Sequence, residues 1–172
     1  MMRAINISLS VIIGIIFFGC EGERVNPEQE SFAFYDDAQI VEEFPFTQDG
    51  EKVVFHHYHM AADKENVADD EYSEDVFFEV NASDEFYLEG DELKNINIVF
   101  KQHCKCQTYN HVSVADGYLK GDKKGTDRYL LEANVKLMGY YIMEGDTLES
   151  QVLHTAFTGL FKRSPLPAGS LN

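Results

Sequence analysis

The stretch Lys52-Val-Val-Phe-His-His-Tyr-His-Met60 decides the fold class of this chain, because its side chains fall into two alternating sets. Alternate residues of an extended strand point to opposite faces of a sheet. Val, Phe and Tyr also favour strands, because they pack well on a pleated surface. The first set is Val53, Phe55, His57 and His59, and the second is Val54, His56, Tyr58 and Met60. The stretch therefore predicts a β-strand.

The same period of two recurs along most of the chain after residue 30. Strand-like segments rich in Val, Ile, Phe and Tyr lie at 75–81, 95–106, 112–120, 129–138, 140–143 and 148–161. Residues typical of turns separate them, as in Asp49-Gly50, Glu89-Gly90-Asp91, the segment 121–125 and Gly145-Asp146. No stretch after residue 30 combines helical apolar spacing with capping residues. The sequence predicts an all-β fold, as a single antiparallel β-sandwich or barrel-like domain.

The first 20 residues have the plan of a secretory signal. Arg3 precedes the apolar run Ala4–Phe18, and Gly19 stands directly before Cys20. This arrangement resembles the signal peptide of bacterial lipoproteins, although Phe17 and Phe18 stand where that family prefers Leu and a small residue. The resemblance implies cleavage after residue 19, acylation of Cys20 by chains such as palmitate, and attachment to the outer membrane.

Two other interpretations of this segment remain open. It is an uncleaved membrane anchor, although its 15 apolar-rich residues fall short of the roughly 20 that a bilayer span needs. Otherwise it is an ordinary secretory signal and Cys20 is incidental. On the lipoprotein interpretation the expected organisation is a signal peptide at 1–19, a lipidated flexible tether at 20–30, the all-β domain at 31–164 and a disordered tail at 165–172. The acidic tether favours the outer surface of the outer membrane over its periplasmic face.

The charge of the chain limits its partners. All 30 Asp and Glu residues follow residue 19, whereas Arg3 precedes it, so the mature protein carries a formal charge of −17 against −16 for the whole chain. Such a surface argues against nucleic acid and against electrostatic docking on anionic lipid. Of the 13 Phe residues of the chain, 11 follow residue 19, as do all nine Tyr residues, and these rings need a core, which predicts an acidic globular domain rather than a disordered chain.

Histidines and cysteines form the one constellation with metal-ligand chemistry. On strands, His57 and His59 would share a face, as would Cys104 and Cys106. If the two strands pair, the four donors could surround Zn²⁺ or copper, which favour imidazole and thiolate. The competing interpretation is a disulfide between Cys104 and Cys106, because an exported protein meets an oxidising compartment. That bridge needs a bulge or turn, since the two Cα atoms of a flat strand would lie about 6.5–7 Å apart. Free thiols and ordinary sheet histidines are the remaining alternatives.

Catalytic signatures are missing from the sequence. It contains no Gly-x-Ser-x-Gly elbow, His-Glu-x-x-His helix, Gly-x-x-x-x-Gly-Lys loop or Ser-x-x-Lys motif. We therefore expect a lipid-anchored, non-enzymatic binding or surface module with no cofactor and with a protein or glycan partner. The first alternative is a lipoprotein that handles Zn or Cu through the His/Cys constellation. The second is a hydrolase such as a β-sandwich glycosidase, whose two carboxylates have no fixed spacing in sequence.

Lipidation is directly testable. Cells fed a clickable fatty acid should label the wild-type protein, and Cys20→Ala should remove both the label and the membrane fractionation, because the acyl chains provide the attachment. If Cys20→Ala remains in the membrane fraction as an uncleaved precursor, the apolar segment itself is the anchor.

Overall fold

The computed structural model describes residues 27–44, 46–62, 72–104, 109, 111–143 and 146–167. The predicted signal segment, Cys20 and Cys106 lie outside these residues. The elements in chain order are β1 (Gln29–Ile40), β2 (Thr47–Asp49), β3 (Lys52–Met60), β4 (Ser73–Val80), β5 (Glu85–Glu89), α1 (Gly90–Lys94), β6 (Asn97–His103), β7 (His111–Lys123), β8 (Arg128–Met143) and β9 (Asp146–Arg163). The strands form one sheet in the order β5-β7-β8-β9-β1-β3-β4-β6, and β2 pairs with β1.

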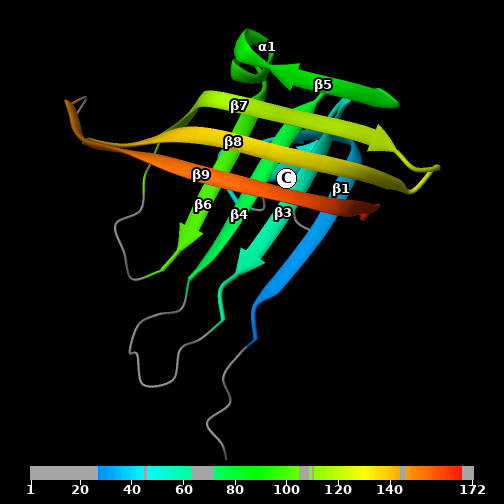
Figure 1. Ribbon diagram of the computed structural model, residues 1–172, viewed down its shortest axis with the longest axis horizontal. Coiled ribbons are helices and arrows are strands. Elements are labelled where there is room, and N and C mark those ends of the chain that lie inside the picture. The colour runs from blue at the N-terminus through cyan, green and yellow to red at the C-terminus, as the bar shows by residue number, and fades with distance from the viewer. Residues whose placement is uncertain are drawn as a thin grey trace, which may run out of the picture.

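The sheet curls into a half-barrel. Strands β7, β8 and β9 cross in front of β1, β3, β4 and β6, so the two halves of the sheet face one another (Figure 1). The halves join where β1 and β9 run parallel, at the register pairs Ala33 with Lys162 and Phe34 with Arg163. Every other strand pair is antiparallel. The all-β prediction is confirmed, and the sheet is mixed because of this one parallel pair.

Aromatic rings fill the space between the two halves. Tyr129 of β8 makes edge contacts with Phe34 and with Phe55, each with ring centroids 5.1 Å apart. Phe55 also meets Phe161 of β9 edge-on at 5.5 Å. Burial of one such ring stabilises the fold by roughly 1.5–3 kcal/mol, and each ring pair adds about 0.5–1.5 kcal/mol. The predicted strand at 52–60 matches β3, whose Phe55 lies in this core.

A second, smaller cluster covers the outer face of the sheet. Tyr35, Val54 and Phe77 are buried there, with Phe46 and Leu166 packed against them. Because the two clusters cover both faces of β3 near its start, the neighbouring residues Val53 and Val54 are both buried. Leu166 belongs to the predicted tail at 165–172, of which residues 168–172 lie outside the described part of the chain.

The structure departs from the sequence prediction in several places. β1 and β2 lie outside every predicted strand, and β7 continues to Lys123, into the segment expected to be a turn at 121–125. The segment expected to be a turn at 89–91 opens the helix α1, whose Leu93 is buried in the main core. Five residues are too few to show helical spacing in the sequence. No helix in the described ranges has the length and hydropathy to cross a membrane.

The half-barrel stays open between β6 and β7. Among the described strands, β6 pairs only with β4. The first half of β7 pairs only with β8, because β5 occupies the other edge of β7 at Tyr118–Asp122 alone. Two free strand edges therefore face a gap in the sheet, and we call this gap the seam.

Gly117 of β7 offers a test of the sheet. Its φ is +118°, and a Cβ there would lie 2.0 Å from the backbone oxygen of Asn134 on β8. Gly117→Ala should therefore lower the free energy of unfolding by about 3 kcal/mol, combining backbone strain with a clash. Gly125, with φ +95° and nothing within 4 Å of its added Cβ, is the matched control. Gly125→Ala should cost about 1–2 kcal/mol, from strain alone. Urea denaturation measures both, and equal losses would contradict the clash.

Candidate functional site

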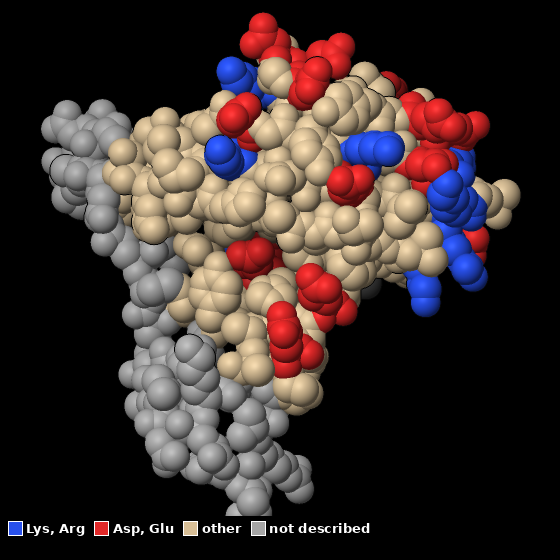
Figure 2. Space-filling model, in the orientation of Figure 1, with Lys and Arg blue, Asp and Glu red and all other residues tan. Residues whose placement is uncertain are grey.

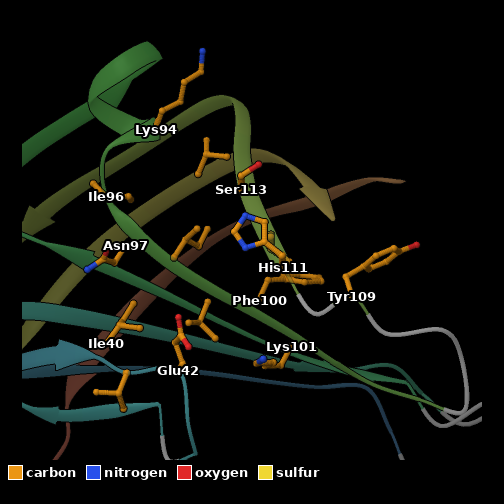
Figure 3. Close-up of a pocket in the computed structure, with 15 residues that line it drawn as sticks. Ile40, Glu42, Lys94, Ile96, Asn97, Phe100, Lys101, Tyr109, His111 and Ser113 are labelled. Atoms are coloured by element: carbon orange, nitrogen blue, oxygen red, sulfur yellow. The ribbon is translucent and has the colours of Figure 1, made fainter. Parts of the chain in front are cut away.

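A cleft lies at the seam. Its volume is about 720 Å³, within the range of roughly 300–1,000 Å³ typical of ligand sites. Figure 3 shows its lining side chains, which come from the end of β1 and the loop after it, from α1, from β6 and the residue before it, and from the start of β7 and Tyr109. They are Ile40, Val41, Glu42, Lys94, Ile96, Asn97, Ile98, Val99, Phe100, Lys101, Tyr109, His111, Val112, Ser113 and Val114.

The cleft follows the edge of β6 rather than one face of it. Successive side chains of a strand point to opposite faces, so a pocket on one face is lined by every second residue. Here all the residues from Ile96 to Lys101 line the cleft. Only the edge of a strand is close to residues of both faces. Along that edge, alternate residues present backbone N–H and C=O groups that β4 does not bond.

The walls of the cleft are largely apolar. Ile98, Val112 and Val114 are half-buried and pack against the main core. On the outer side the wall continues with Ile40 at the end of β1 and with Val41 directly after it. A ligand in the seam therefore meets hydrophobic side chains above and below a row of backbone hydrogen-bonding groups.

Four side chains that can carry charge line the cleft. They are Glu42, Lys94, Lys101 and His111. Figure 2 shows acidic side chains gathered around α1, where Asp91 and Glu92 occupy the first turn and Lys94 the last. In a chain of net charge −16, the seam is thus a place where cations outnumber carboxylates.

The histidines predicted as metal ligands have other partners. His57 has an exposed fraction of 3%, and its ring contacts those of Phe32, with centroids 5.1 Å apart, and Phe157, with centroids 4.2 Å apart. Its Nε2 lies 3.2 Å from Glu30 Oε1, and its buried Nδ1 has no partner among the described residues. Burial lowers the pKa of His57 below its usual value, against the opposing effect of Glu30. His59 Nε2 lies 3.0 Å from Glu28 Oε1.

Cys104 lies apart from these histidines in the sheet. Cys104 directly follows β6 and is disulfide-bonded. The cysteine bonded to it lies outside the described residues, and so does Cys106. β4 separates β6 from β3, the strand of His57 and His59. Within the described part of the chain, no group of three or more His, Cys, Asp or Glu side chains is arranged to hold a metal ion. The four-donor site stays a prediction for the reduced protein.

The structure instead joins two other histidines through one carboxylate. His56 Nε2 of β3 lies 2.5 Å from Asp75 Oδ1, and His103 Nε2 of β6 lies 2.8 Å from Asp75 Oδ2. Burial works to raise the pKa of Asp75, but the hydrogen bonds and charge of both imidazoles together hold it below its usual value. The sequence did not reveal this cluster, because alternation places each residue on a face but does not fix the register between strands.

No family model matches the chain, and no curated protein or solved structure is significantly similar to it. The functional proposal is therefore built on the chemistry and geometry of the seam.

The Asp75 cluster makes a pH-dependent contribution to stability. Because folding depresses the pKa of Asp75, this contribution is present above its unfolded pKa of about 3.9 and is lost as the pH falls through the lower folded pKa. Asp75→Asn should lower the free energy of unfolding at pH 7 by about 1.5–3 kcal/mol, since two charge-assisted hydrogen bonds are lost. The difference from wild type should shrink below pH 3.9, as measured by urea denaturation. Glu85→Gln, at an exposed carboxylate, is the control and should change little. A difference that does not vary with pH would rule out the ionic contribution.

Proposed function

We propose that this protein is a non-enzymatic binding module of the bacterial cell envelope that binds an extended polypeptide segment along the free edge of β6. In this proposal the mature chain is attached to the outer membrane through lipidated Cys20. The observation that carries the binding role is the lining of the seam by consecutive residues from Ile96 to Lys101. We choose a polypeptide partner over a glycan because the free edge of β6 presents a regular row of backbone N–H and C=O groups.

A strand edge offers hydrogen bonds in the geometry that another polypeptide backbone matches. An added strand would pair with the N–H and C=O groups that β6 does not share with β4. Each such bond contributes about 1 kcal/mol net. Alternate side chains of the added strand would then enter the apolar gap beside Ile98 and Val112. Backbone pairing supplies affinity, and these side chains supply specificity.

The cleft chemistry supports binding over hydrolysis. A glycosidase needs two carboxylates flanking the scissile bond. Among the described residues that line the cleft, Glu42 is the single carboxylate. The proposal therefore assigns the seam to recognition and assigns no covalent step to it.

The binding role can be tested with the lipidated protein in detergent and a display library of random ten-residue peptides. Peptides that are enriched on the wild type should slow hydrogen exchange of alternate amides in Asn97–His103 by at least about tenfold, because the free edge becomes bonded. Val112→Asp, which places a charge in the apolar wall, should abolish this binding. Ala156→Asp, on the exposed face of β9, is the matched control and should bind like wild type.

Two results would contradict the proposal. One is a set of selected peptides that leaves the exchange of the β6 amides unchanged. The other is a Val112→Asp variant that keeps its circular dichroism spectrum and binds as tightly as wild type.

A further inference from the structure

Three side chains form a continuous surface beside the seam, which we call the rim: Phe44, Phe46 and Lys101. Phe44 and Phe46 belong to the loop between β1 and β2, which closes at the register pair Ile40 with Thr47. The ring of Phe46 lies 5.8 Å from that of Phe44, and Lys101 Nζ lies 5.4 Å from the Phe46 centroid. Residues of the same loop and strand, Val41 and Glu42 among them, line the cleft itself.

The loop holds Phe44 out into solvent. Val41 N donates to Phe46 O at 3.0 Å, and Phe46 N donates to Glu43 O at 2.8 Å. Phe46 has a φ of +65°, a strained conformation for an aromatic residue, and its ring packs on Phe77 at 5.7 Å. Phe44 is left 86% exposed. The strained, hydrogen-bonded loop therefore half-buries one aromatic ring and exposes the other.

Lys101 has a carboxylate opposite it but does not pair with it. In the sheet register Lys101 faces Asp75 of β4. Both oxygens of Asp75 are taken by His56 and His103. Among the described residues no carboxylate lies within ion-pair distance of Lys101, whose ammonium reaches over the Phe46 ring instead. The His56–Asp75–His103 cluster thus leaves the Lys101 charge available at the seam.

We infer that the polypeptide bound in the seam presents, on its outward face, a carboxylate to Lys101 and an adjacent apolar side chain to Phe44. This inference rests on the proposed function. An added strand would place its outward side chains beside those of Val99 and Lys101, because neighbouring strands share their faces. Salt screens charges beyond about 8 Å at physiological ionic strength. Lys101 and Lys94 line this cleft with Glu42 as the single carboxylate among its described lining residues, so positive charge sets the local preference in spite of the acidic chain.

Two acetylated and amidated peptides test the inference on the lipidated protein. One is Val-Glu-Val-Phe-Val-Glu-Val-Phe, and the other has Lys in place of both Glu residues. Every register on β6 that points Val inward puts a charged residue and a Phe side by side on the outer face. The acidic peptide should bind wild type at least about tenfold more tightly. Lys101→Gln should bring the two affinities together, and Lys101→Glu should reverse their order. Lys136→Glu, on the exposed face of β8, is the charge control and should keep the wild-type order.

Phe44 has its own matched pair of variants. Phe44→Ala should weaken binding of the acidic peptide by about tenfold, as expected for a partly buried aromatic anchor. It should leave the urea midpoint unchanged, because the ring is exposed in the free protein. Leu130→Ala, which removes an exposed apolar side chain from β8, should bind like wild type.

The outcomes separate this inference from the proposed function. If both peptides protect the β6 amides with equal affinity, strand addition holds and the role of Lys101 is wrong. If Phe44→Ala binds like wild type, Phe44 is not an anchor. If neither designed peptide binds while library peptides do, the acidic–apolar pattern is wrong. If no peptide protects β6, strand addition itself fails.

Discussion

Packing of aromatic rings between the two halves of the sheet holds this structure together. Backbone pairing joins the halves only along the short parallel contact between β1 and β9. The remaining contacts between the halves come from edge-on aromatic rings of both halves: Phe34, Phe55, Tyr129 and Phe161. Tyr129 also donates its hydroxyl hydrogen to the Ser83 carbonyl at 3.0 Å, which satisfies the polar end of a buried ring. The orientation of the halves is therefore a matter of side-chain packing rather than of sheet hydrogen bonds.

The half-barrel is left open on the side opposite the contact between β1 and β9. A sheet that closed fully would leave no free edge, whereas this one ends at β6 and at the first half of β7. The unpaired backbone groups lie in a cleft with apolar walls rather than on a flat exposed edge. The seam is thus protected from open aggregation but remains accessible to a single added strand, which is the basis of the proposed function.

Carboxylates on the outer face fix the strands that border this seam. Glu79 is buried and accepts hydrogen bonds from Ile40 N at 2.7 Å, Lys52 Nζ at 2.6 Å and Asn97 Nδ2 at 2.9 Å. It therefore ties β1, β3 and β6 to β4, where a buried carboxylate without partners would be costly. Asp75 acts similarly for β3 and β6 through His56 and His103. Because Glu79 and Asp75 already accept hydrogen bonds from other residues, neither forms an ion pair with Lys101, which therefore remains part of the rim.

The sequence by itself determined most of the strands after residue 50, because alternation along a strand is local, whereas β1 and β2 were not predicted. Residues 52–60 became β3, and 129–138 with 140–143 became the single strand β8, since Gly139 continues the extended chain between them. β1 begins at Gln29, inside the segment expected to be tether, because its pairing with Met60 is a long-range contact that no local pattern encodes. The register between strands likewise comes only from the tertiary structure. It decided that His57 packs against Phe32 and Phe157, that Asp75 joins two histidines, and that β6 has a free edge. A period of two assigns each side chain to a face, but only the packing of distant strands selects its neighbours.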